Sequence, residues 1–483
     1  MDAYQDLNIL FSSHYSDEYI RVPEFSTRQV NCGPLCRDRH DGHRQLSFQT
    51  PSGEYDIRSV IEKLPNNQKP ELIVVKADAT KGNHPLNIDS LSIPSLLIIG
   101  DTMHQRQPLQ TMLTYASEQK FDYYIADHGK RHLHFFHQIG INAHWLPGLL
   151  IRTWDIPFQE QREIPLSFVG QAGRFHPNRR FLLDCLNRDN FSLLETQSSQ
   201  EQACIIYAKS KITLNPSMMG DINLRVFEAL SAGGFLITDD ISPQAGKNQI
   251  FRDGDHLVLF EDYEDLKCKI KYYLDNPSEA LKIAQQGYSE FWANHSPEVK
   301  KKQLMKLVFE GEIPPLYDGR CDRRSTVFPI ETKDSLFKRI QKYEYLQSIH
   351  RVKENLRILF LTVSNQYLLS DLVDLPRLDV SYSSLLSKDL RIAHVSDQTT
   401  AFVIEKENND FLFDIAVVGW DTFQCEISTD YIKRSKIEQI ILSNEKKLND
   451  LSQVDHLECQ IQNLGYTPLQ HDGFTAYHLN ITS

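Results

Sequence analysis

Short apolar runs alternate along this chain with longer helix-like segments, and no other feature constrains the fold as strongly. Two of these runs are "ELIVVKAD" (71–78) and "PSLLIIGD" (94–101). Continuous apolar runs fit parallel strands that helices cover on both faces. The segments "QPLQTMLTYASEQK" (107–120) and "HLHFFHQIG" (132–140) are expected to be such helices. The alternation predicts an α/β protein.

The length of 483 residues and several changes in composition indicate more than one domain. We expect a first Rossmann-like domain over residues 1–150 and a second over 151–310. Residues 311–335 are rich in proline, glycine and charge, which is typical of a linker. Residues 336–483 are expected to form a small accessory α/β domain.

The C-terminal segment carries strand-like runs such as "RILFLTV" (357–363) and "FDIAVVGW" (413–420). With the closing "LGYTPLQHDGFTAYHLN" (464–480), they resemble methyltransferase-like domains. The glycine-rich loop of such domains is missing after the first run, so the resemblance implies a degenerate domain. We expect a structural, dimerising or acceptor-recruiting role, and a homo-oligomer formed through this domain is one form it can take.

Charge and composition exclude several classes of protein. The net charge of −12 argues against a nucleic-acid backbone as the main partner. No apolar run approaches the roughly 20 residues of a membrane helix, and "MDAYQDLNIL" at the N-terminus lacks the pattern of a signal peptide. The eight cysteines are scattered, with one close pair at Cys32 and Cys36, and indicate reduced thiols instead of a zinc site. These features predict a cytoplasmic protein without a transmembrane segment.

The stretch "DINLRVFEALSAGGFLITDD" (221–240) predicts a helix that Asp221 caps, a stop at Gly-Gly and a short strand. It places Arg225 and Glu228 on one helix, and two interpretations are open. The pair can be a surface ion pair at i, i+3 spacing. Alternatively, Arg225 binds a phosphate near the helix start while Glu228 accepts hydrogen bonds from a sugar.

The earlier stretch "LSFVGQAGRFHPNRR" (166–180) predicts a strand, a glycine-containing loop and a helix. Glycines such as Gly170 and Gly173 let backbone N–H groups approach a phosphate closely. Arg174 in the loop is a further phosphate-binding candidate. The two arginines after it, at positions 179 and 180, are expected to belong to a solvated helix face.

The run from "NLRVFEALSAGGFLITDD" (223–240) to "IFRDGDHLVLFEDYEDLKCKIKYYLDNPSEALKIAQQG" (250–287) resembles GT-B glycosyltransferases, closest to the spore-maturation (CgeB-like) branch. The resemblance implies two Rossmann-like domains facing a cleft, with a nucleotide-sugar bound to the second. By matching position, Glu228 would bind the donor ribose. Asn223, Arg225 and the loop 170–174 would lie near the diphosphate or the sugar. The resemblance also implies a reaction without metal or cofactor.

The first domain is expected to hold the acceptor. "IIGDTMHQ" places Asp101 and His104 after a predicted strand, and "DYYIADHG" places His128 in the same way. Histidine can accept a proton near neutral pH. Asp101, His104 and His128 are therefore taken together as the candidate catalytic groups. The alternative is that the histidines belong to the scaffold. That interpretation is favoured for the three that crowd the following helix, at positions 132, 134 and 137.

The sequence therefore predicts an enzyme that transfers a sugar from a nucleotide-sugar to a hydroxyl of a glycan, a protein or a small molecule. Two alternatives remain at this point. One is a non-catalytic nucleotide-sugar-binding or assembly protein that keeps the donor fold. The other is an epimerase or phosphorylase built on the same fold.

Overall fold

The computed structural model divides into two compact units, Met1–Ile330 and Glu331–Ser483. The residues that the structure describes are 4–14, 23–38, 46–103, 105, 107–127, 130–173, 177–217, 220–241, 245–318, 332–350, 357–361, 379–382, 401–402, 415–419, 439–443, 461–462, 466–471 and 474–479.

The first unit begins with a seven-stranded parallel sheet in the order β3–β2–β1–β5–β7–β8–β9. The apolar runs of the sequence supply its centre, and every residue of β5 and β7 is buried. The strands are β1 (Ile9–Ser12), β2 (Val30–Gly33), β3 (Ser47–Gln49), β5 (Leu72–Ala77), β7 (Ser95–Ile99), β8 (Tyr123–Ala126) and β9 (Ala143–Trp145).

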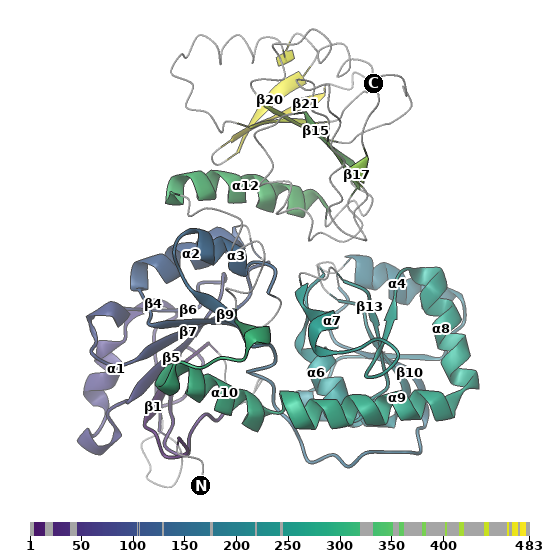
Figure 1. Ribbon diagram of the computed structural model, residues 1–483, viewed down its shortest axis with the longest axis horizontal. Coiled ribbons are helices and arrows are strands. Elements are labelled where there is room, and N and C mark those ends of the chain that lie inside the picture. Colours follow the sequence, from purple (N-terminus) through teal and green to yellow (C-terminus); the bar gives the residue numbers. More distant parts are fainter. Residues whose placement is uncertain are drawn as a thin grey trace. The chain divides into compact units, whose positions relative to one another are not determined.

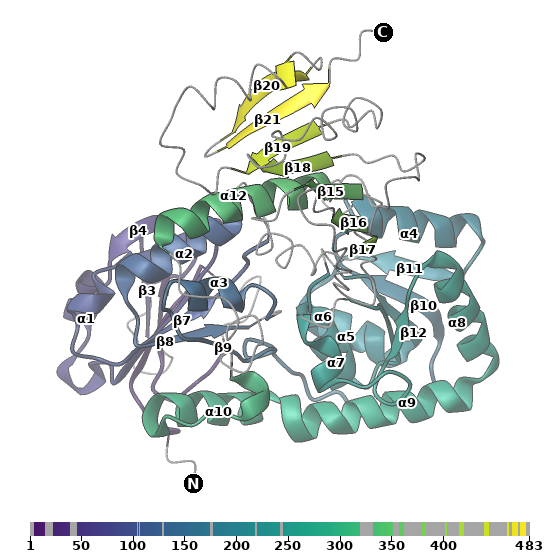
Figure 2. The ribbon, with the colours of Figure 1, turned by 45° about the horizontal axis from the view of Figure 1, so that its top comes forward.

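Helices cover this first sheet on both sides (Figures 1 and 2). In both views α2 and α3 lie on one side and α10 on the other. A separate parallel pair, β4 (Gly53–Asp56) and β6 (Asn83–Leu86), lies outside the sheet. The helices are α1 (Arg58–Lys63), α2 (Pro108–Gln119), α3 (Leu133–Gln138) and α10 (Pro297–Glu310), with 3₁₀ turns η1 (Asn66–Gln68) and η2 (Ile88–Ser90).

The second sheet has five parallel strands in the order β11–β10–β12–β13–β14. This is the 2-1-3-4-5 order of a doubly wound sheet, whose topological switch point lies between its first and third strands. In the present chain that point lies between β10 and β12. The strands are β10 (Ile164–Val169), β11 (Leu193–Thr196), β12 (Ser210–Asn215), β13 (Leu236–Asp239) and β14 (Val258–Phe260).

Helices also pack on both faces of the second sheet, with α6 and α7 opposite α8 in both views and α5 beside α6 in Figure 2 (Figures 1 and 2). Buried apolar side chains from the strands and from α4, α8 and α9 form one continuous core there. The helices are α4 (Pro177–Arg188), α5 (Gln200–Lys209), α6 (Leu224–Ser231), α7 (Lys247–Ile250), α8 (Tyr263–Asp275) and α9 (Pro277–Glu290), with the π-helical turn η4 (Phe291–His295) and the 3₁₀ turn η5 (Pro315–Tyr317).

Helix α10 lies within the range that we expected to form the second domain, yet it contacts the first sheet. The Tyr123 hydroxyl of β8 donates to the carbonyl oxygen of Val308 over 2.9 Å. Tyr4 stacks on Phe309 with ring centroids 5.4 Å apart. The chain therefore returns to its first domain after the second sheet is complete.

The second unit contains helix α12 and a seven-stranded sheet in the order β17–β16–β15–β18–β19–β21–β20. Five strands are parallel in the doubly wound order 3-2-1-4-5, and β20 and β21 are antiparallel. The elements are α12 (Lys333–His350), β15 (Arg357–Leu361), β16 (Asp379–Tyr382), β17 (Ala401–Phe402), β18 (Ile415–Gly419), β19 (Gln439–Ser443), β20 (Tyr466–His471) and β21 (Phe474–Leu479).

These sheets confirm the predicted α/β class, with two doubly wound sheets in the first unit and a third α/β sheet near the C-terminus. Each helix among the described residues is too short or too polar to cross a membrane.

Candidate functional site

Arg225 lies at the switch point of the second sheet. Its Nε donates to the carbonyl oxygen of Val169 at the end of β10, over 2.8 Å. Its Nη1 donates to Oδ1 of Asn215 at the end of β12, also over 2.8 Å. The guanidinium stacks on the Phe168 ring, 4.6 Å from its centroid. A fixed positive charge therefore spans the carboxyl ends of the two strands between which doubly wound sheets bind ligands.

Gly170 makes room for this guanidinium. Its φ of +145° is one that side-chain-bearing residues rarely adopt, and a Cβ atom there would lie 2.1 Å from Nη2 of Arg225. The next glycine of the predicted loop, Gly173, has open space where a Cβ would be. The two glycines thus differ in role, because only the first is required by a close approach.

Asn223 begins helix α6, and the prediction that Asp221 caps it is wrong. Asn223 occupies the N-cap position without a side-chain capping bond, and Asp221 Oδ1 accepts from the adjacent N–H of Ile222 instead. Among the described residues, neither amide atom of Asn223 has a hydrogen-bond partner, although both are buried. Buried polar atoms without partners are rare and costly, so this amide is well placed to bind a polar ligand group.

Glu228 lies one turn further along α6 and is 8% exposed. Its Oε1 accepts a 3.2 Å hydrogen bond from Nε2 of Gln200, at the start of α5. Burial raises the pKa of Glu228, and the nearby charge of Arg225 and the bond from Gln200 partly offset this rise. The carboxyl group is thus held in place with acceptor capacity left over, as a ribose-binding group requires.

The interpretation of Arg225 and Glu228 as a surface ion pair is wrong. No ion pair joins them, because Arg225 donates to β10 and β12 while Glu228 accepts from α5. Their i, i+3 spacing gives them a common helix but different partners. The helix therefore presents its cation and its carboxylate to two separate parts of the candidate donor site.

Arg179 and Arg180, expected on a solvated face, have different environments. Arg180 is half-buried and forms ion pairs with Asp184 and Glu195. Arg179 is 7% exposed, and its guanidinium donates to the carbonyl oxygens of Gln171 and Pro216, over 2.8 to 3.2 Å. Burial lowers the pKa of Arg179 to about 10, and Arg225 adds to the shift. The expectation was therefore wrong for Arg179, which links the loops after β10 and β12.

A further buried cation lies beside the end of β13. Lys247, 2% exposed, donates from Nζ to the carbonyl oxygen of Asp239. The Asp239 carboxylate in turn accepts from the backbone N–H of Ser217, over 2.7 Å, and from the Ser217 hydroxyl. Burial lowers the pKa of Lys247, while the aspartates nearby raise it. The loop after β12 is thus held to the end of β13.

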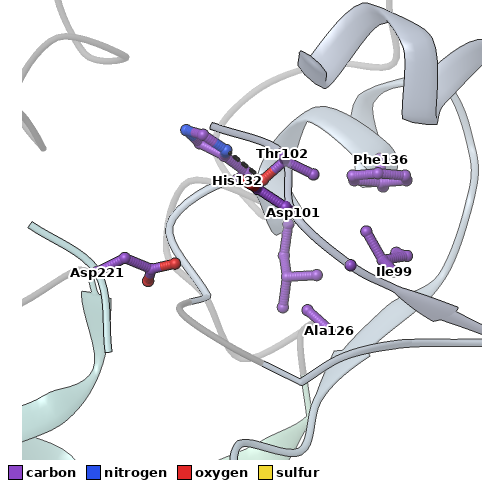
Figure 3. Close-up of a pocket in the computed structure, with 9 residues that line it drawn as sticks. Ile99, Asp101, Thr102, Ala126, His132, Phe136 and Asp221 are labelled. Carbon is purple, nitrogen blue, oxygen red and sulfur yellow. Dashed lines mark hydrogen bonds between the residues drawn. The ribbon is translucent and has the colours of Figure 1, made fainter. Parts of the chain in front are cut away.

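The candidate catalytic residue Asp101 lines a pocket at the carboxyl ends of β7 and β8 (Figure 3). Its Oδ1 accepts from the backbone N–H of Met103 over 2.8 Å. Thr102 and His132 also line the pocket and are joined by a 2.8 Å hydrogen bond. Asp221 completes the lining from the second domain, and its carboxylate points toward this group in Figure 3. The pocket therefore brings carboxylates from both domains together.

The three histidines near α3 divide between scaffold and pocket. His134 Nδ1 bonds the carbonyl oxygen of Arg131, and His137 Nε2 bonds that of Ala143, so these two are structural, as expected. His132 is buried too, but it lines the pocket, which we did not predict. Helical spacing alone shows which residues share a face, and it cannot show that this position lies at a pocket. The prediction also missed Thr102, which lies in the loop after β7 next to the predicted Asp101.

Three predicted residues, His104, His128 and Arg174, lie outside the described residues. The described part of the chain contains no group of three or more histidine, cysteine, aspartate or glutamate side chains arranged to hold a metal ion.

Comparison with known proteins bears directly on the second domain. Residues 170–306 match the family model described as glycosyl transferase-like. The match includes Arg225, Glu228 and both glycines of the loop. It identifies a glycosyltransferase domain and confirms the enzyme class predicted from the sequence. No curated protein matches the sequence.

The solved structures to which the chain is similar include the following three. Sucrose-phosphate synthase from Thermosynechococcus elongatus is 14% identical, with 63% of this chain and 99% of that chain covered and a TM-score of 0.42. Anabaena HepE in complex with UDP and glucose is 11% identical, with 63% and 100% covered and a TM-score of 0.43. A glycosyltransferase from Rickettsia africae is 13% identical, with 64% and 99% covered and a TM-score of 0.43. These similarities are too weak to assign a substrate.

Proposed function

We propose that this glycosyltransferase moves a sugar from a nucleotide-sugar donor to an acceptor hydroxyl, and that the donor diphosphate lies over the switch point between β10 and β12. The observation that carries the proposal is the Arg225 guanidinium fixed to both strand ends. Asn223 adds a buried amide without a partner at the start of α6. A helix start with its free N–H groups favours an anion at this place.

In this arrangement three fixed cations stabilise the departing diphosphate. Arg179, Arg225 and Lys247 are fixed by backbone carbonyl groups. Because they are already in place, little reorganisation is needed as negative charge develops on the leaving group. We propose that this electrostatic stabilisation replaces a metal ion, so that activity persists in excess EDTA. Loss of activity in EDTA, restored by a divalent cation, would contradict this part of the proposal.

Glu228 is proposed to accept hydrogen bonds from the ribose hydroxyls of the donor. The support is its position on the helix that begins at the proposed diphosphate site, together with its fixed orientation by Gln200. A carboxylate can accept from two vicinal hydroxyls at once. Gly170, Gly173 and Arg174 are proposed to line the diphosphate side of the same site.

The acceptor hydroxyl is proposed to bind in the pocket of Asp101, Thr102 and His132, with Asp221 opposite. A carboxylate there can take the proton that the hydroxyl loses as its oxygen bonds to the sugar. Asp101 is therefore the proposed base, and His104 and His128 stay candidates for the same step. The acceptor can be a glycan, a protein or a small molecule.

We further propose that the chain belongs to the spore-maturation (CgeB-like) branch, which the order of motifs in residues 223–287 supports. A cytoplasmic location is proposed because Cys32, Cys185 and Cys204 are buried thiols without disulfide bonds. The accessory unit is proposed to form homo-oligomers or to recruit the acceptor.

The experiment that tests the function is a thermal-shift screen of the full chain with UDP-, GDP-, ADP-, CMP- and dTDP-sugars, followed by a transfer assay. A ligand that binds the native state raises the melting temperature. We expect one nucleotide class to raise it and to support donor hydrolysis or transfer. Binding without either reaction would indicate a nucleotide-sugar-binding protein, and no binding by any donor would refute the proposal.

A further inference from the structure

A second hollow lies in the first domain, between helix α2 and the β4–β6 pair. Its volume is about 240 Å³, close to the lower end of the range for small-molecule sites, about 300 Å³. Its lining comes from β4, the turn before β6, β6 itself and one face of α2, and it shares no residue with the pocket of Figure 3. We call it the α2 groove.

A buried histidine gives this groove a fixed hydrogen-bond acceptor. His84 is 4% exposed and stacks on Tyr115 with ring centroids 4.2 Å apart. Its Nε2 lies 2.9 Å from the carbonyl oxygen of Asp78. Since a carbonyl can only accept, Nε2 carries the proton. Burial lowers the pKa of His84, so the ring is neutral and Nδ1 is an acceptor. Among the described residues, no group donates to Nδ1.

Three charged side chains and one amide of the groove also keep hydrogen-bonding capacity. Glu54, Glu118 and Lys81 line it and form no ion pair with any described residue. Gln119 Oε1 is buried and has no hydrogen-bond partner in the described part of the chain. Hydrogen-bond acceptors thus outnumber positively charged groups. With two glutamates and one lysine, the lining carries one net negative charge. A ligand must therefore supply many hydrogen-bond donors and carry no net negative charge.

We propose that the α2 groove binds a segment of a neutral oligosaccharide, apart from the site of transfer. Sugar hydroxyls donate to the carboxylates and to the imidazole, and they accept from the amides and from the lysine. A phosphate-bearing or sulfated ligand would meet Glu54 and Glu118 with only Lys81 to compensate. The groove belongs to the first domain alone, so the inference does not depend on the transfer reaction.

The test is isothermal titration calorimetry on the full chain, without any nucleotide-sugar, using four neutral hexasaccharides: maltohexaose, cellohexaose, xylohexaose and chitohexaose. The double variant Thr114→Val/Gln119→Leu removes a hydroxyl and an amide from the lining while keeping the side-chain shapes. Gln285→Leu, an exposed position on α9, is the matched control. Glu118→Gln, at an exposed position, repeats the test should the double variant fail to fold.

At least one hexasaccharide is expected to bind, and the double variant should weaken it about tenfold, the loss expected for two neutral hydrogen bonds. The control and the acceptor-pocket variant Asp101→Asn should bind the hexasaccharide as the unmodified chain does, because Asp101 does not line the α2 groove. Absence of binding by all four sugars, or binding that the groove variants leave unchanged, would overturn the inference. Loss of binding in Asp101→Asn would also overturn it, because the sugar would then occupy the acceptor pocket of the transfer site. None of these outcomes bears on nucleotide-sugar binding, which the thermal-shift screen measures separately.

Discussion

Replacing Glu228 by glutamine tests the donor site with little disturbance of the fold. The variant keeps an oxygen that can accept from Gln200, the contact that fixes the side chain over 3.2 Å. It removes the negative charge and turns one acceptor into an NH₂ group that opposes a ribose hydroxyl. Charge-assisted hydrogen bonds contribute about 1.5–3 kcal/mol each. We expect a loss of roughly 2–3 kcal/mol, or about 30- to 150-fold in the Kd of the donor.

The stability of the same variant can also be predicted. Its melting temperature distinguishes a loss of donor binding from a loss of the folded state. Because burial raises the pKa of Glu228 above its ordinary value of 4.5, the folded state holds the proton more tightly than the unfolded state. Stability is lost as pH rises from about 4.5 through the folded pKa. The glutamine variant escapes this loss, so its melting temperature at pH 7 should equal or exceed that of the unmodified chain, with the advantage vanishing toward pH 4.5.

The assay is calorimetric titration with the donor that the thermal-shift screen selects. Glu201→Gln, an exposed glutamate in the first turn of α5, is the matched control because it removes an equal charge outside the proposed contact. An unchanged Kd for Glu228→Gln with an intact melting temperature would refute the reasoning. An equal loss of donor affinity in both variants would refute it as well. The removal of one negative charge, whatever its position, would then explain the effect.

Three more outcomes follow. Gly170→Ala forces a Cβ against Arg225 at a φ of +145°, so it should lower the free energy of unfolding by about 1–3 kcal/mol and abolish most donor binding. Gly173→Ala has open space for its Cβ, so thermal shift and calorimetric titration should show little change. Asp101→Asn should lower kcat by about 10²- to 10⁴-fold with the donor Kd unchanged, and an unaltered kcat would remove it as the base. Burial lowers the pKa of Lys300 to about 7, so the free energy of unfolding should rise between pH 7 and 9. Lys300→Met should flatten that rise, as measured by urea unfolding at each pH. An identical pH dependence in the variant would contradict the lowered pKa of Lys300.

The sequence predicted the sheets where apolar runs are continuous. The runs around β5 and β7 become fully buried central strands, and α2 fills the predicted segment 107–120 almost completely. It did not predict β2 and β3, because "VNCG" and "SFQ" are too short to show a pattern. Short strands gain their stability from neighbours in the sheet, which local sequence does not reveal.

The local structure around the candidate site residues was predictable where a motif fixes both residue type and local geometry. The helix that carries Arg225 and Glu228 and its glycine stop were found in this way, and Gly233 has the predicted left-handed φ of +73°. The burial of Arg179 and the position of His132 at a pocket were not found. Both depend on contacts between segments distant in the sequence, such as the bond from Arg179 to Pro216. Local patterns carry no information about such pairs.

The central claim is that a nucleotide diphosphate binds over the ends of β10 and β12. The most direct measurement is a crystal structure of the chain with the nucleoside diphosphate of the donor that raises the melting temperature. The account predicts phosphate oxygens at the start of α6 beside Asn223 and ribose hydroxyls on the Glu228 carboxylate. A nucleotide bound elsewhere, with Glu228 still held by Gln200 alone, would contradict it.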